Sequence, residues 1–210
     1  QDRLSLRIDA PDPEIQQLAV EALGWLAQEM PQHEWKGDEK LLTLLKSQHE
    51  HLYEWAKDAL EKAFQGSNLG ENKKLGGVLR TMLKSGDKRQ QLAAAELLQY
   101  FVKNDDTIPA LLDAMDKTHW QEVMDKIKVS LEILAGNYHI MAIEHTYEPT
   151  ADPKKSPLIR LAKAKSLSTN MKKNMGQSEN ARADAINAIA IWRQVRAAPV
   201  LVSLLADPDI

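Results

Sequence analysis

The pattern Leu-x-Thr-x-Leu-Lys-Ser occurs twice in this chain, beginning at Leu41 and again at Leu79, and this repetition constrains the fold more than any other feature. In both copies an alanine follows the first leucine by fifteen residues, at Ala56 and at Ala94. The 38 residues from one copy to the next are enough for two helices and their connections. The repetition therefore predicts a tandem array of helical pairs.

Each of these alanines opens a set of small or apolar residues at positions i, i+3, i+4 and i+7, which is the spacing of one buried stripe on a helix. Turn-forming and N-cap residues precede several of the expected helices, at 9–13, 85–87 and 116–118. We therefore expect an all-α protein in which the second helix of each pair carries the stripe, with a single irregular bundle as the alternative. The template fits five places, which start at Ala19, Ala56, Ala94, Ile127 and Ala185.

Two segments of the chain resemble HEAT repeats, particularly the short bacterial HEAT-like repeats of the phycobilisome-lyase group. One leads from Asp12-Pro13 into Ala19–Leu23, and the other runs from Ala198-Pro199 to Asp209. The resemblance implies a right-handed α-solenoid of about five stacked antiparallel helical hairpins. The family often has an arginine three residues before each stripe, and here only the fifth unit has one, Arg182. The Asp–Arg ladder of regular HEAT arrays is therefore mostly missing.

The repeat spacing divides the chain into three parts. Residues 1–136 hold about four hairpins, residues 137–177 interrupt the array, and residues 178–210 resume it. Leu4 precedes Ala19 by fifteen residues, and Leu201 predicts a further stripe beyond the last residue. We expect a part of a longer solenoid, or an array whose ends are covered by other domains; frayed terminal helices are the alternative.

The interruption is basic, with three acidic and seven basic residues and therefore a net charge of +4. Pro157 is expected to open a short helix within it. Because repeat proteins often place functional insertions on one face, this cluster is a candidate site for phosphate or an acidic partner. A solvated helix with snorkelling lysines is the alternative. The basic residues are Lys154, Lys155, Arg160, Lys163, Lys165, Lys172 and Lys173.

The positions opposite the buried stripe predict a second candidate surface. At about 100° per residue, the second, fifth and ninth residues after each stripe start point away from the core. In a HEAT-like array this side lines the inner face, which would favour a basic partner; an ordinary solvated acidic face is the alternative. Gly24, Val129 and Ala190 fall on the same side, the last two towards the insertion or an apolar ligand. The carboxylates are Glu21, Asp58, Glu61, Glu96 and Glu132.

Few residues are arranged for catalysis or for metal binding. The chain has no cysteine, which excludes disulfides, thiolate-bound metals and thiol nucleophiles. It also lacks a phosphate-binding glycine loop and a nucleophile elbow. His49 and His51 diverge by about 200° on a helix, and the set His139, Glu144, His145 and Glu148 has mixed spacing. We predict no catalytic residue, no metal and no cofactor.

The tryptophans divide into two groups. Trp25, Trp55 and Trp192 fall near the buried stripes, so we expect them in the core or at contacts between helices. Trp35 and Trp120 fall at loop or helix-start positions, where exposure would make them interface anchors.

These features together predict a non-catalytic protein–protein interaction scaffold, with another protein or another domain of a longer chain as its partner. We expect a cytoplasmic protein, and no apolar run approaches the 18 residues of a membrane span. One alternative is nucleic-acid binding in the manner of HEAT-like DNA glycosylases, using the basic insertion. Another is a bilin lyase or chaperone of the short HEAT-like group, in which the chromophore thiol would come from the client.

Overall fold

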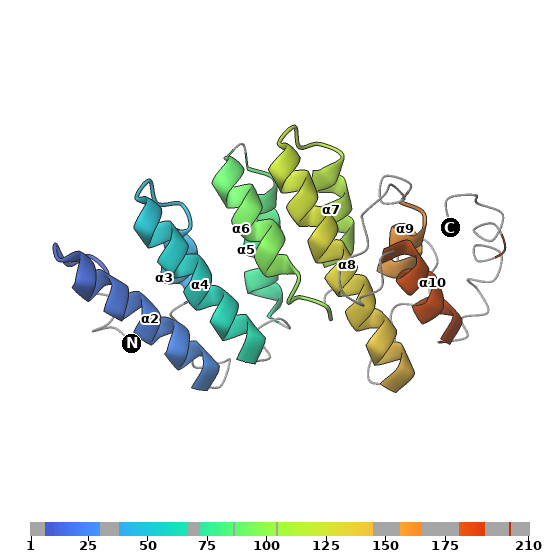
Figure 1. The fold of residues 1–210 in the computed structure, drawn as a ribbon, viewed down its shortest axis with the longest axis horizontal. Helices are drawn as coiled ribbons and strands as arrows, with labels where there is room; N and C mark the ends of the chain where they lie inside the picture. Colours follow the sequence, from blue (N-terminus) through green and yellow to red (C-terminus); the bar gives the residue numbers. More distant parts are fainter. Residues whose placement is uncertain are drawn as a thin grey trace. The chain divides into compact units, whose positions relative to one another are not determined.

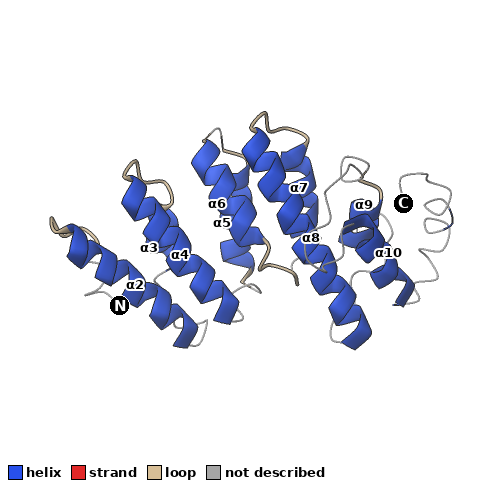
Figure 2. Ribbon diagram, viewed as in Figure 1, coloured by secondary structure: helices blue, strands red, loops and turns tan. Residues whose placement is uncertain are grey.

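A computed structural model describes residues 7–29, 38–66, 72–85, 87–103, 105–144, 156–164, 181–191 and 202 of the chain. Within these residues all regular secondary structure is helical, which confirms the predicted all-α class (Figure 2). The helices are α2 (Pro13–Glu29), α3 (Asp38–Leu44), α4 (Glu50–Gly66), α5 (Lys73–Leu83), α6 (Lys88–Leu98), α7 (Thr107–Met115), α8 (Gln121–Glu144), α9 (Pro157–Ala162) and α10 (Ala181–Ile191).

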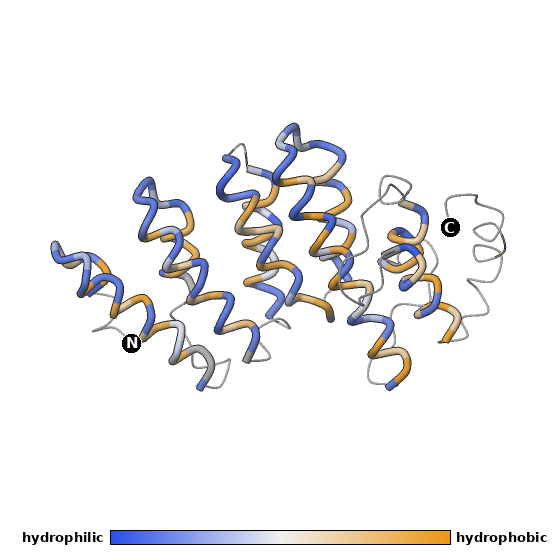
Figure 3. Tube along the Cα trace, viewed as in Figure 1, coloured by the Kyte–Doolittle hydropathy of each residue, from blue (hydrophilic) through white to orange (hydrophobic). Residues whose placement is uncertain are grey.

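The chain forms two compact units, Gln1–Phe101 and Val102–Ile210. In the first unit α3 packs against α4, α5 packs against α6, and α4 lies beside both α2 and α6 (Figure 1). The stripe that starts at Ala56 is fully buried, as are Leu41 and Leu79, which begin the two copies of the repeated pattern. Figure 3 shows the alternation of hydrophilic and hydrophobic stretches along α4 that a helix buried on one side produces.

Helix ends in the first unit follow the predicted turn residues. The Asp12 carboxylate accepts a hydrogen bond from the Glu14 amide at 2.9 Å, at the start of α2. The Asp87 carboxylate accepts one from the Gln90 amide at 2.8 Å and caps α6. Asn72 caps α5 in the same way and was not predicted. These side chains satisfy amides that a helix leaves unpaired in its first turn.

The helices α2 and α4 approach each other closely at Gly24. A Cβ placed on Gly24 would lie 2.8 Å from the Cβ of Ala59 and 2.9 Å from its Cα. The residue is buried between α2 and α4, so its predicted position on the outward face is wrong. The physical reason is that only a residue without a side chain lets the two backbones approach this closely.

In the second unit α8 packs against α7 and α10, and α9 packs against α7 and α10. The α8 helix is 24 residues long and continues through residues 137–144, the first part of the predicted interruption. Pro157 opens α9 as predicted, and the apolar side chains of α9 are buried. Residues 156–164 therefore contribute to the core of this unit.

Arg182 joins α10 to the end of α9. Its side chain is fully buried, and its Nε donates a hydrogen bond to the Ala162 carbonyl at 2.9 Å. Ala162 is the last residue of α9, and the last carbonyls of a helix have no partner within it. The single arginine at the position three residues before a stripe thus caps the C-terminal end of the neighbouring helix.

Candidate interaction surfaces

The predicted acidic residues are accessible but are not equivalent. Glu21 and Asp58 are exposed, and Glu61 and Glu96 are half-buried, all in the first unit. Glu21 accepts a hydrogen bond from the Gln17 amide group at 2.8 Å. Glu132 belongs to the second unit, where burial raises the pKa of its carboxyl group and Lys128 partly opposes that shift.

Lys57 forms ion pairs with two acidic residues of the first unit, Glu54 and Glu96. Its amine lies 3.2 Å from a Glu54 carboxylate oxygen and 3.7 Å from a Glu96 carboxylate oxygen, so it links α4 to α6. Burial favours the neutral amine, but the charges of Glu96, Glu54 and Glu61 outweigh burial and raise the pKa of Lys57. Glu54 and Glu96 are therefore already engaged by a positive charge, whereas Glu21 and Asp58 face solvent.

Only two members of the predicted basic cluster lie within the described residues. Arg160 forms an ion pair with Asp113 of α7, and Lys163 is exposed just after α9. The other five fall outside the described residues: Lys154, Lys155, Lys165, Lys172 and Lys173. No observation in the described part of this segment favours phosphate or nucleic-acid binding over an exposed helix surface.

A strip of apolar side chains is exposed along α2. Leu18 is 65% exposed and Trp25 is 60% exposed, with Ile15 also exposed and Ala22 half-exposed between them. The successive spacings of 3, 4 and 3 residues place all four on one side of the helix. The expectation that Trp25 lies in the core or at a contact between helices is wrong, because α2 packs on α4 through its opposite side, around Gly24, and leaves Trp25 exposed. Trp55 of α4 is half-buried, and its ring centroid lies 5.0 Å from that of His51.

A second apolar stripe is exposed along α8. Ile140 is 53% exposed and Ile143 is 59% exposed, and Val129 and Ile133 continue the stripe towards the start of the helix. Gly136 falls in the same line, and a Cβ placed there would meet no atom within 4 Å. The stripe spans fourteen helical steps from Val129 to Ile143, or about 21 Å at 1.5 Å per residue. The predicted exposure of Val129 and Ala190 is confirmed.

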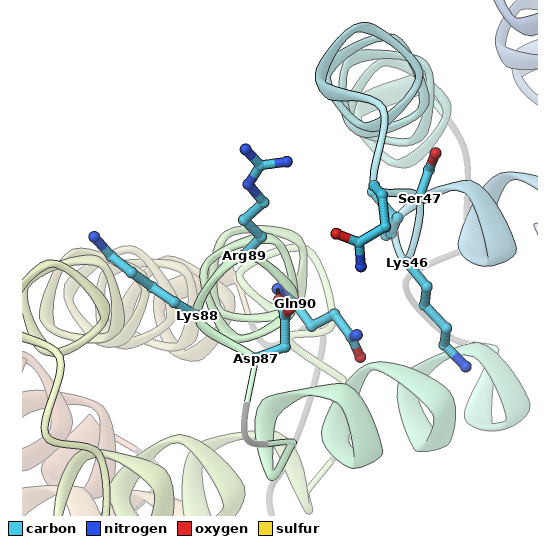
Figure 4. Close-up of a pocket in the computed structure, with 8 residues that line it drawn as sticks. Lys46, Ser47, Asp87, Lys88, Arg89 and Gln90 are labelled. Atoms are coloured by element: carbon cyan, nitrogen blue, oxygen red, sulfur yellow. Dashed lines mark hydrogen bonds between the residues drawn. The ribbon is translucent and has the colours of Figure 1, made fainter.

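A polar pocket of about 290 Å³ lies between the turn after α3 and the start of α6 (Figure 4). It is lined by residues 45–48 and 87–90, including Lys46, Lys88 and Arg89. The Asp87 carboxylate occupies the helix start, and Arg89 forms an ion pair with Glu50. In Figure 4, Lys88 extends away from the turn that carries Ser47. The arrangement gives a polar recess rather than a converging set of cations.

The histidines within the described residues have local partners. His49 and His51 lie with ring centroids 5.7 Å apart at the start of α4. His139 of α8 has its Nδ1 at 3.5 Å from a carboxylate oxygen of Asp184, a buried residue of α10. Across the described residues, no group of three or more His, Asp or Glu side chains is arranged to hold a metal ion.

Tyr53 is a buried polar residue at the contact between α4 and α6. Its hydroxyl group donates a hydrogen bond to the Arg89 carbonyl at 3.1 Å, which joins α4 to the start of α6. Burial is the main cause that raises the pKa of Tyr53 to about 12, so the phenol is neutral at ordinary pH. This polar group stabilises the helix packing and takes no part in either exposed strip.

The fold and these surfaces define an all-helical protein whose described helices combine buried stripes with exposed apolar strips. None of the helices in the described residues has both the length and the apolar character needed to cross a membrane. No family model matches the chain. No curated protein matches it either.

Two solved structures are similar to the chain, and both are described as engineered proteins. One is 20% identical with a TM-score of 0.46, and the match covers 99% of this chain and 89% of that one. The other is also 20% identical with a TM-score of 0.47, and covers 99% of this chain and 64% of that one. Because both TM-scores lie below 0.5, these similarities carry no argument about function.

Proposed function

We propose that this chain is a non-catalytic protein-interaction module built from HEAT-like helical pairs. One repeated spacing in the sequence supports the HEAT-like helical pairs. The fifteen residues from a first-helix leucine to a second-helix stripe recur at Leu41, Leu79 and Leu112, and each of these leucines is buried. A spacing that repeats together with its burial is typical of a solenoid in which each unit packs on its neighbours.

The functional part of the proposal rests on the exposed stripe of α8. Four β-branched apolar side chains lie in one line on that helix, at intervals of 4, 7 and 3 residues. This spacing matches the apolar seam that one helix presents to another. Covering the exposed part of each side chain would contribute about 1 kcal/mol, enough to support specific binding when several are buried together. Contiguous exposed apolar surface of this kind is typical of protein interaction sites.

Affinity capture with a charged double variant tests the proposal. The intact chain should retain one or more proteins from a lysate of its own cells, and I140E/I143E should lose them. The matched control is K117E, which changes the net charge by the same two units at an exposed position of the same unit outside the stripe. Circular dichroism should show equal helix content in all three proteins. Equal capture by wild type and I140E/I143E, or no captured protein at all, would contradict the proposal.

A further inference from the structure

The charged residues beside the apolar strip of α2 indicate which kind of partner binds it. The sequence of α2 contains three glutamates and neither lysine nor arginine. Glu14 and Glu21 are exposed, and Glu29 is exposed at the end of the helix. An apolar strip edged by charge of one sign favours a partner of the opposite charge.

The carboxylates occupy a defined edge of the strip. At 100° per residue, Glu14 and Glu21 fall between the apolar residues and Gly24, which contacts α4. Glu29 falls in line with Leu18 and Trp25, one turn beyond Trp25. On the neighbouring helix α4, Asp58 is an exposed carboxylate and Lys62 is an exposed cation. The strip is therefore apolar along its centre and acidic along one side and at one end.

The shape of the strip fits a helix. Ile15 and Trp25 are ten residues apart, which corresponds to about 15 Å, or three helical turns. The 3–4–3 spacing of the four apolar residues is that of a helix packed along another helix. Leu18 and Trp25 are the most exposed of them, and an exposed tryptophan is a common anchor of a protein interface.

We infer that the α2 strip (Ile15, Leu18, Ala22 and Trp25, edged by Glu14, Glu21 and Glu29) binds an amphipathic helix of a partner protein whose apolar face is flanked by lysine or arginine. A second copy of this chain fits less well. In an antiparallel two-fold contact the same edges meet, so Glu14 and Glu21 of one copy would face those of the other. The inference rests on the proposed function and adds the chemistry of one partner.

Fluorescence anisotropy with synthetic helical peptides tests this inference on the full chain. The probe is a labelled peptide of about 18 residues, with leucines at intervals of 3 and 4 and lysines on both flanks. One comparison peptide has glutamate in place of every lysine, and another has the same composition in scrambled order. We expect the lysine peptide to bind at least tenfold more tightly than either comparison peptide, and more weakly as salt concentration rises.

Variants then locate the binding site. W25A should weaken binding of the lysine peptide at least tenfold, and E14Q/E21Q should weaken it several-fold and reduce its salt dependence. The control K117A, at an exposed position of the other unit and outside both apolar strips, should bind the peptide like wild type. Because Trp25 is exposed, W25A should retain its helix content; if it does not, L18Q replaces it as the apolar variant.

Several results would overturn the inference. They are equal binding of the lysine and glutamate peptides, unchanged binding by the apolar variant, and concentration-dependent dimerisation that W25A abolishes. If the wild-type chain does not bind the lysine peptide but still captures proteins through the α8 stripe, only the inference about the α2 strip is overturned. Absence of both would overturn the proposed function as well.

Discussion

Replacing Gly24 with alanine tests the close contact between α2 and α4. Alanine is the better helix former, which would contribute about 1 kcal/mol in an unhindered helix. Against that gain, the new Cβ would lie 2.8 Å from the Cβ, 2.9 Å from the Cα and 3.0 Å from the carbonyl oxygen of Ala59. Carbon atoms in contact normally lie about 3.5–4.0 Å apart. Because two of these atoms are backbone, no side-chain rotation relieves the overlap, and α2 must move away from α4.

Overpacking of this kind costs about 1–3 kcal/mol. It also separates the surfaces on either side of the contact, so we expect G24A to lower the free energy of unfolding by about 1–2 kcal/mol net. The measurement is urea unfolding followed by circular dichroism at 222 nm.

The matched control is G77A in α5, where the new Cβ would lie 3.9 Å from the nearest atom, Nη2 of Arg80. That variant should raise the free energy of unfolding by about 0.5–1 kcal/mol. If G24A stabilised the protein as G77A does, α2 and α4 would not approach as described. The orientation that exposes Leu18 and Trp25 would then be wrong as well.

Three further substitutions test other contacts. R182A should destabilise the second unit by about 2–4 kcal/mol, because it leaves a cavity and removes the donor to the Ala162 carbonyl. Thermal unfolding measures this loss, and an unchanged stability would contradict the capping role of Arg182. D87A should cost about 1 kcal/mol through loss of the α6 cap, with exposed Lys84 changed to alanine as a neutral control. Burial raises the pKa of Tyr53 to about 12, above the value of 10.0 expected for an unfolded chain. Its contribution to stability is therefore complete below pH 10 and is lost as pH rises towards 12, so the stability difference between wild type and Y53F should shrink over that range; a constant difference would contradict it.

The sequence was sufficient to predict the buried side of the second helices. Residues at i, i+3, i+4 and i+7 lie on one face whatever the neighbouring helices do, so the stripes starting at Ala56 and Ile127 could be located without a structure. The turn residues at 85–87 were equally informative, because Asp87 acts within its own helix end. Both features depend on interactions within a few residues along the chain.

The predictions that failed concern the rotation of a helix relative to its neighbour. Gly24 and Trp25 are consecutive, and α2 turns the first towards Ala59 and the second towards solvent. Their positions depend on which residues of α4 meet α2, which the periodicity of one helix does not specify. The one signal available was a glycine inside a helical pattern, at a position where three of the other four repeats carry Glu61, Gln99 and Glu132.

Site-specific photo-crosslinking tests directly whether a partner protein contacts the α8 stripe. A photoreactive benzoylphenylalanine at position 140 should form covalent adducts with another protein in the cells that make this chain. The same group at position 117, an exposed residue in the turn after α7, serves as the control and should form few adducts. If the α8 stripe is a protein interface, position 140 should form more adducts than position 117. Equal or absent adducts at the two positions would contradict it.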